Sequence, residues 1–317
     1  MYGLCRDDHG RVLLVRGARH RRSDLPGVWQ VPGGGLRHGE HPADAVVREF
    51  AEETGLAVEV AGLRAVVADV LALPRRGMAE HTDRVIYDVD VRGGELRAEL
   101  DGSSDLAAWV TGAKAAGLPL VPFTAELLGL PVDPGTLRAA EGDEAADGPS
   151  GDVVPPGQRR EIGQRFAAYG LVTDPAGRVL LTLIADSYPG AGRWHLPGGG
   201  TDHGEQPAAA FLRELAEEAD QVGRITGLLD VSHRRNPAAV GPEGYPIDWH
   251  AVRVAYRAVV DVPTEPRVTE AAGGSTARAE WFFPHRAVGL PLTEIAATAL
   301  ASLIDAAAGQ EAGKAPV

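Results

Sequence analysis

Apolar and polar positions form the same pattern in two separate parts of the chain. Residues 2–6 and 11–17 are apolar runs on either side of a short polar turn, which predicts two strands joined by a tight turn. The same pattern returns at residues 169–174 and 177–183. Because a whole set of elements recurs, the sequence predicts a duplicated domain and not a solenoid of short repeats.

Further segments with a period of two follow in each copy. The runs at 72–83 and 232–249 between them are rich in Pro, Arg, Gly and His, and are longer than a hairpin needs. We expect these two runs to be loops that select the substrate. The expected strands are 58–71, 84–91, 224–231 and 250–262, and short helices are expected near 122–128 and 293–307.

A helical pattern lies between the strands of the first copy. Pro42 suits the first turn of a helix, and Gly55 suits the left-handed residue that ends one. The sequence therefore predicts a helix over residues 42–54. The stripe that would pack on a sheet consists of Ala43, Val46 and Phe50.

Three carboxylates recur along this predicted helix. Glu49, Glu52 and Glu53 are three and four positions apart, a spacing that places them on one face. Like charges at that spacing repel, so the cluster needs a positive partner. A divalent cation is the natural candidate.

The second copy repeats this spacing and departs from it only at the end. The matching positions are Gly199, Glu205, Arg213, Glu214, Leu215, Glu217 and Glu218. Asp220 and Gln221 then stand where the first copy has Gly55 and Leu56. Since Asp adopts a left-handed conformation less readily than Gly, we expect a costlier or reshaped helix exit.

The length of 317 residues is comfortable for two domains. We expect a first domain over 1–132, whose opening strand is short, and a second domain over 159–307. Residues 133–158 are rich in Pro, Gly, Ala, Asp and Glu without an apolar period, which predicts a flexible linker, and 308–317 resemble a disordered tail.

Composition excludes several classes of function. The net charge of −13 argues against a surface that binds a nucleic-acid polymer, although a bound metal could still attract a small anion. One cysteine precludes an intramolecular disulfide, and no apolar run reaches the length of a membrane span. We therefore expect a cytoplasmic protein without a membrane partner.

The spacing G-x5-E-x7-R-E-U-x-E-E-x-G-U, with U a bulky apolar residue, resembles that of the Nudix hydrolase family. The copy at 34–56, the first box, matches it in full, and the second box matches from Gly199 to Glu218. The resemblance implies an α+β fold: two tandem Nudix-type α/β/α sandwich domains, each with a mixed sheet between helices. It also implies a pyrophosphohydrolase that cleaves a nucleoside diphosphate linked to a further group, such as an NTP, sugar nucleotide or dinucleotide.

The resemblance also assigns roles to the residues of both boxes. Mg²⁺ or Mn²⁺ would be the cofactor, because hard carboxylate oxygens suit these ions. The implied ligands are Glu49, Glu52, Glu53, Glu214, Glu217 and Glu218, and Arg48 and Arg213 would orient and neutralise them. The support expected for loop and substrate comes from Gly33, Gly34, Glu40, Gly198, Gly199 and Glu205, with the glycine N–H groups free to approach an anion.

Other residues remain open to two interpretations. Glu99 and Glu270 precede later turns, where Nudix enzymes often carry an additional carboxylate, so either could serve as a base or be an ordinary exposed acid. Trp29 and Trp194 could stack on a nucleotide base, but core packing is the favoured interpretation. The loop histidines, His38 and His203, are expected to be solvated and to bind no ligand.

The sequence leaves the substrate undetermined. It favours the first domain as the stronger catalyst, because only that domain keeps Gly55 and Leu56. The alternative hypothesis is that one domain, more readily the second, binds a nucleotide and regulates without hydrolysing it.

Overall fold

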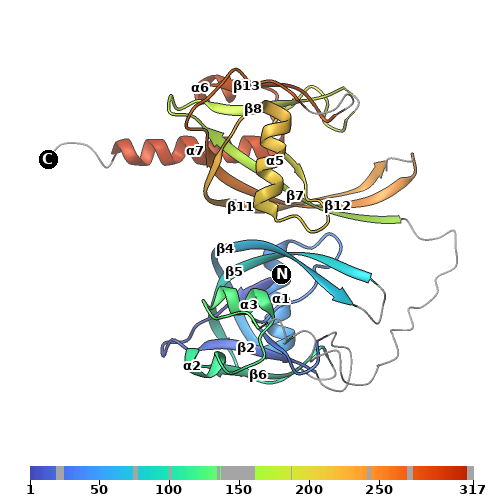
Figure 1. Cartoon of the computed structure of the whole chain (residues 1–317), viewed down its shortest axis with the longest axis vertical. Helices are drawn as coiled ribbons and strands as arrows, with labels where there is room; N and C mark the ends of the chain where they lie inside the picture. The colour runs from blue at the N-terminus through green and yellow to red at the C-terminus, as the bar shows by residue number, and fades with distance from the viewer. Residues whose placement is uncertain are drawn as a thin grey trace. The chain divides into compact units, whose positions relative to one another are not determined.

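The computed structural model (Figure 1) combines sheets with few helices, which confirms the α+β class. The chain forms two compact units. Unit 1 consists of Met1–Asp69, Arg84–Gln164 and His233–His250, and unit 2 of Val70–Asp83, Arg165–Ser232 and Ala251–Val317. The structure describes residues 1–18, 25–73, 78–99, 102–133, 136, 161–186, 188–240, 244–269 and 274–312.

The first repeat contributes two three-stranded sheets. Their strand orders are β1-β5-β4 and β3-β2-β6. Strand β1 runs parallel to β5, whereas β2 runs antiparallel to both β3 and β6, so the repeat contains both kinds of strand pairing. The elements are β1 (Tyr2–Leu4), β2 (Val12–Gly17), β3 (Trp29–Gln30), α1 (Pro42–Thr54), β4 (Leu56–Leu73), β5 (Met78–Gly94), β6 (Ser104–Val110), α2 (Gly112–Ala115) and α3 (Pro122–Leu127).

The second repeat contributes a seven-stranded sheet. Its main order is β11-β12-β7-β8-β13, with β10 paired to β7 and β9 to β8. The elements are β7 (Glu161–Thr173), β8 (Val179–Ile184), β9 (Trp194–His195), β10 (Gly198–Gly200), α5 (Pro207–Ala219), β11 (Arg224–Val240), β12 (Pro246–Val259), β13 (Thr276–Phe282), α6 (Pro284–Ala287) and α7 (Glu294–Ala312).

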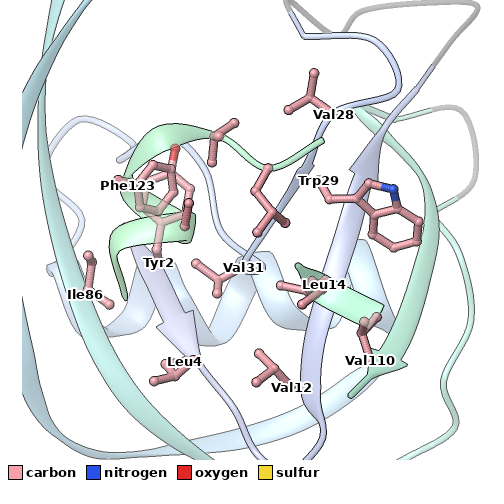
Figure 2. Packing of buried hydrophobic residues seen from close by; sticks show 14 residues of the cluster. Tyr2, Leu4, Val12, Leu14, Val28, Trp29, Val31, Ile86, Val110 and Phe123 are labelled. Carbon is pink, nitrogen blue, oxygen red and sulfur yellow. The ribbon is translucent and has the colours of Figure 1, made fainter. Parts of the chain in front are cut away.

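The core of unit 1 combines residues of β1, β2, β3, β5 and β6 with residues of α3 (Figure 2). Tyr2, Val31 and Phe123 lie in this cluster with Trp29, which is buried. Trp194 is likewise buried in the equivalent cluster of unit 2. Both tryptophans therefore pack in cores, as the sequence favoured, and burial of such large side chains dominates core energetics.

Each box helix lies against its sheet through one aromatic ring. Phe50 of α1 is buried over Gly3 of β1, where an added Cβ would lie 2.5 Å from the ring. Phe211 of α5 is buried over Gly170 of β7 in the same way. A glycine at this strand position thus lets the helix approach closely, and the approach fixes where the helix presents its carboxylates.

The prediction of loops at 72–83 and 232–249 is wrong, because the described residues of both segments lie largely in strands. Strand β4 continues to Leu73 and β5 begins at Met78, while β11 continues to Val240 and β12 begins at Pro246. Pro, Arg, Gly and His in these segments indicated loops, but β4–β5 and β11–β12 are neighbouring pairs, and pairing overrides the weak local propensity. Each of these segments also contributes residues to the unit built mainly from the other repeat, namely 70–83 to unit 2 and 233–250 to unit 1.

The observed ends of helices and strands can be compared with the domain and tail boundaries expected from the sequence. Helix α7 continues to Ala312, so the first residues of the tail expected over 308–317 are helical. Strand β1 has 3 residues and β7 has 13, in agreement with the short opening strand of the first repeat. Most of the linker at 133–158 lies outside the described residues, and the domain boundaries stay a prediction.

Within the described ranges, no helix is long and apolar enough to cross a membrane.

Candidate active sites

Both box helices begin with proline and end with a left-handed residue. Gly55 has φ 72° and donates its N–H to Ala51 O, whereas Asp220 has φ 52° and donates its N–H to Ala216 O. The exit at Asp220 is therefore not reshaped, because the aspartate adopts the capping conformation that glycine supplies in the first repeat. The other half of the expectation, a higher conformational cost of the exit, stays a prediction.

Gln221 replaces the apolar residue of the pattern through hydrogen bonds. Its side chain is buried, and its Nε2 donates to Thr264 Oγ1 at 2.8 Å. The N–H of Thr264 donates to its Oε1 at 3.1 Å. A buried amide is tolerated here because both of its ends have partners.

In unit 1, Arg48 is the centre of the carboxylate cluster. Its Nε and Nη2 donate to the two oxygens of Glu40 at 2.8 and 2.9 Å. Its Nη1 reaches Glu49 at 2.7 Å and Glu52 at 3.3 Å, while Nη2 also donates to Gly35 O at 2.9 Å. The guanidinium therefore joins the loop before the helix to two carboxylates on the helix.

In unit 2, Arg213 repeats these contacts. Its Nε and Nη2 donate to the two oxygens of Glu205 at 2.9 and 3.1 Å. Its Nη1 donates to Glu214 at 2.9 Å and Glu217 at 3.1 Å, and Nη2 donates to Gly200 O at 3.1 Å. The two arginine-centred clusters have the same connectivity.

The three glutamates of each set differ in how deeply they are buried. In unit 1, the Glu52 side chain is 42% exposed, Glu49 is largely covered, and Glu53 is 3% exposed on the face that carries Phe50. Glu53 thus lies between the exposed acidic face and the sheet.

The set in unit 2 shows the same gradient. The Glu217 side chain is 44% exposed, Glu214 is largely covered, and Glu218 is 2% exposed. In both helices, the last carboxylate of the box therefore lies deepest.

The buried carboxylates meet the glycine turns. Gly33 N–H donates to Glu53 Oε2 at 2.8 Å, and Gly198 N–H donates to Glu218 Oε2 at 2.8 Å. These two amides therefore orient a glutamate of the box, whereas the sequence suggested that they would approach a substrate anion.

The next glycine of each turn has a different role. A Cβ at Gly34 would lie 2.8 Å from the carboxylate of Glu49, and one at Gly199 would lie 2.5 Å from Glu214 Oε1. Only a residue without a side chain lets these carboxylates lie against the turn.

Burial and charge shift the protonation of the cluster in unit 1. Burial raises the pKa of Glu53 to about 8, and the negative charges of Glu49 and Glu99 act in the same direction. Burial also raises the pKa of Glu49, although Arg48 opposes the shift. The hydrogen bonds from Arg48 lower the pKa of Glu40. A buried carboxylate among like charges is a group that a cation would stabilise.

The acids and hydroxyls near the last glutamate differ between the units. In unit 1, Glu99 accepts from the N–H of Ser104 at 3.1 Å and from its Oγ at 3.3 Å. In unit 2, Thr276 Oγ1 donates directly to Glu218. Glu270 lies outside the described residues, so its suggested role stays a prediction.

The loop histidines depart in part from the expectation of solvation. His203 is exposed, but the His38 side chain is only 19% exposed, and its Nε2 lies 3.1 Å from Asp248 Oδ1. Asp248 lies in β12 and belongs to unit 1. No pattern in the sequence connects this residue with the first box, because it falls in a segment that was predicted to be a loop.

Within the described ranges, no three His, Cys, Asp or Glu side chains converge closely enough to form a metal site by themselves. The carboxylates instead contact Arg48 and Arg213, as described above. Mg²⁺ commonly takes only one or two carboxylates from a protein and completes its shell with water and phosphate oxygens. The donor chemistry of the clusters is therefore compatible with an ion that arrives with an anionic substrate.

Known proteins resemble parts of the chain. It is 34% identical over 96 residues to an ADP-ribose pyrophosphatase of Methanocaldococcus jannaschii, covering 30% of this chain and 52% of the relative. It is 36% identical over 113 residues to a putative 8-oxo-dGTP diphosphatase 2 of Mycobacterium tuberculosis, covering 36% of this chain and 74% of that protein. The chain thus spans about half the length of the archaeal relative.

The chain also resembles a solved structure and a family model. A MutT NUDIX hydrolase from Burkholderia pseudomallei is 28% identical with a TM-score of 0.34, over 43% of this chain and 95% of that one. The model of the NUDIX domain matches residues 2–128 and 163–303, which together make up most of the chain. Both matched segments contain one arginine-centred box, so the chain belongs to the Nudix family and contains its domain twice.

Proposed function

We propose that the chain is a metal-dependent pyrophosphohydrolase that cleaves a nucleoside diphosphate linked to a further group by attack of water on phosphorus. The observation that carries this proposal is the pair of matched clusters, in which Arg48 and Arg213 each orient the carboxylates of one box helix. Carboxylates on an ordinary surface helix are solvated, so they need neither a shared arginine nor glycine turns against which to pack. A catalytic site, by contrast, requires its carboxylates to be held in a fixed position.

Glu49, Glu52 and Glu53 would hold Mg²⁺ or Mn²⁺ at the first site. When bound, such an ion screens phosphate charge, activates water and stabilises the leaving oxygen. The equivalent residues of the second site are Glu214, Glu217 and Glu218. The deep burial of Glu53 and its raised pKa support the need for a cation there.

The other residues of each site would position the metal ligands and accept the proton of the attacking water. Arg48 keeps Glu49 and Glu52 in place and ties them to Glu40, so the ligands need little reorganisation when substrate binds. The proton of the attacking water would pass to one of the box glutamates or to Glu99, whose charge acts on Glu53. Arg213 and Glu205 would support the second site in the same way.

The names of the relatives suggest which candidate substrates to test first. One relative is named an ADP-ribose pyrophosphatase and another a putative 8-oxo-dGTP diphosphatase, so these two compounds are the first to test. We propose a small nucleotide-type substrate and not a nucleic-acid polymer, because the net charge of −13 opposes binding to a long phosphate backbone.

The alternative is that the second repeat binds a nucleotide without hydrolysing it. Its altered box ending suggested this possibility, but Asp220 closes α5 in the same conformation as Gly55 closes α1. We therefore favour hydrolysis at both sites.

A substrate panel tests the proposal. Purified full chain is incubated with ADP-ribose, 8-oxo-dGTP, a nucleoside triphosphate and a dinucleotide, with Mg²⁺ or Mn²⁺, and the products are separated chromatographically. We expect a nucleoside monophosphate product from at least one compound. Absence of turnover over the whole panel with either metal would contradict the proposal.

A further inference from the structure

Two histidines occupy equivalent places in the two repeats. His81 and His250 lie in β5 and β12, and both precede the matching stretches that begin at Arg84 and Arg253. The spacing between the two histidines, 250 − 81 = 169, equals the spacing between the two arginines, 253 − 84 = 169. His250 belongs to unit 1 and His81 to unit 2, although each lies in the repeat that forms most of the other unit.

Within unit 1, His250 contacts the loop before the box helix. Gly39 N–H donates to His250 Nδ1 at 3.1 Å, and the histidine is 0% exposed. His250 Nε2 lies 3.2 Å from His233 Nδ1, so a histidine that accepts at Nδ1 can donate at Nε2. Arg235 fixes the same strands through Asp248, with Nε at 3.0 Å from Oδ1.

Within unit 2, His81 makes the matching contact. Gly204 N–H donates to His81 Nδ1 at 2.7 Å. His81 Nε2 lies 3.3 Å from Asp83 Oδ1, and Thr201 Oγ1 lies 3.5 Å from Asp83 Oδ2. The partner of the glycine N–H is therefore the same atom of the equivalent histidine in both units.

The contacted glycine stands directly before the glutamate that binds the central arginine. Gly39 has φ +80° and is followed by Glu40, which accepts two hydrogen bonds from Arg48. Gly204 has φ +84° and is followed by Glu205, which accepts two from Arg213. A histidine that binds this N–H thus holds the loop in place just before the glutamate. The glutamate binds the arginine, and the arginine binds the proposed metal-binding carboxylates.

We propose that His250 is a positioning residue of the first active site and His81 a positioning residue of the second. Each histidine holds the loop that orients the central arginine. Each site is therefore completed by a strand segment of the other repeat, and neither repeat alone contains all the groups that order its own box. The catalytic part of this inference rests on the proposed function, whereas the contact itself can be tested without turnover.

Hydrogen exchange of the full chain tests the contact. In the unaltered protein, the amides of Gly39 and Gly204 should exchange slowly for loop amides, because each has an acceptor. His250→Leu should speed exchange at residues 36–40 and leave 201–205 unchanged, and His81→Leu should do the reverse. The exposed His9→Leu serves as the control and should change neither loop.

Fast exchange of both glycine amides in the unaltered protein would overturn the proposal even if the leucine variants failed to fold. Equal changes at both loops in each variant would also overturn it, since they would indicate general loosening. His250→Asn, whose side-chain oxygen can replace Nδ1 as acceptor, should restore slow exchange at 36–40.

Turnover tests the catalytic consequence. With Glu218→Gln removing the second site, His250→Leu should lower kcat about 10-fold or more with a smaller change in KM, because it disturbs positioning and not the substrate contacts. His250→Asn should recover most of the loss, and His9→Leu should have no effect.

Failure of the proposal and failure of the proposed function give different results. Unchanged kcat in His250→Leu, or an equal loss in His250→Leu and His250→Asn, would overturn the positioning role while leaving hydrolysis intact. Absence of turnover in the unaltered chain would instead contradict the proposed function, and the exchange experiment would still decide whether the histidines hold the loops.

Discussion

The two box sites share their centre and differ at their ends. The contacts of Arg48 and Arg213 agree pair by pair, but the first helix ends in Gly55 and Leu56 and the second in Asp220 and Gln221. The centre depends on the geometry of a guanidinium with three carboxylates, which few other side chains can reproduce. The helix exit needs only a residue in the left-handed conformation, followed by a side chain that can be buried. Different residue types can therefore occupy these two positions.

The surroundings of the last glutamate form the second difference. Thr276 donates to Glu218, whereas the equivalent hydroxyl, Ser104, donates to the neighbouring Glu99. Glu53 and Glu218 both accept a hydrogen bond from a glycine N–H. The expectation that the first site is the stronger catalyst therefore no longer rests on the helix exit, and the environment of this carboxylate is the place to test it.

The largest effect should come from the central arginines. Arg48→Met, with the second site removed by Glu218→Gln, should lower turnover about 100-fold, because Glu40, Glu49 and Glu52 lose their shared partner. Arg213→Met with Glu53→Gln should have an effect of similar size. Arg11→Met, which removes a surface ion pair with Asp7, is the control. If the steady-state rates of the Arg48 and Arg213 variants differed little from those of the control, the central arginines would not be needed for turnover.

A smaller effect is expected at Thr276. Thr276→Val removes the hydroxyl that donates to the buried Glu218, which should lower the free energy of unfolding by about 1.5–3 kcal/mol. Ser104→Ala should cost less, because Glu99 is half-buried and water can replace the lost bond. Urea unfolding of the full chain measures both, and an equal loss in the two variants would remove this distinction between the sites.

The smallest effect is expected at the helix exit. Asp220→Gly should raise the free energy of unfolding by about 1 kcal/mol, since glycine adopts φ 52° without strain. Gly55→Asp should destabilise, because a Cβ there would lie 2.7 Å from Glu95 O. Thermal unfolding of both variants provides the comparison, and stabilisation by Gly55→Asp would contradict this account of the exits.

The sequence predicted the parts of the site that depend on local spacing. Pro42 and Gly55 delimited α1 correctly, and the pairing of Arg48 with Glu49 follows from their places in the box. It could not predict the depth of Glu53, because burial depends on the sheet beneath the helix.

The long strands were the other limit of the sequence. Residues such as Pro237 and Arg235 favour a loop by composition, yet they lie in β11. Pairing between strands supplies hydrogen bonds that no local pattern reveals, and the histidine contacts depend on those strands. The contact of His250 with Gly39 joins positions 211 residues apart, so no local sequence pattern could indicate it.

The most direct test compares four proteins with one substrate from the panel: the unaltered chain, Glu53→Gln, Glu218→Gln and the double variant, each with saturating Mg²⁺ and with excess chelator. The two-site account predicts partial turnover in each single variant. It also predicts background turnover in the double variant and in every chelated sample. Full turnover by the double variant, or turnover that excess chelator leaves unchanged, would contradict it.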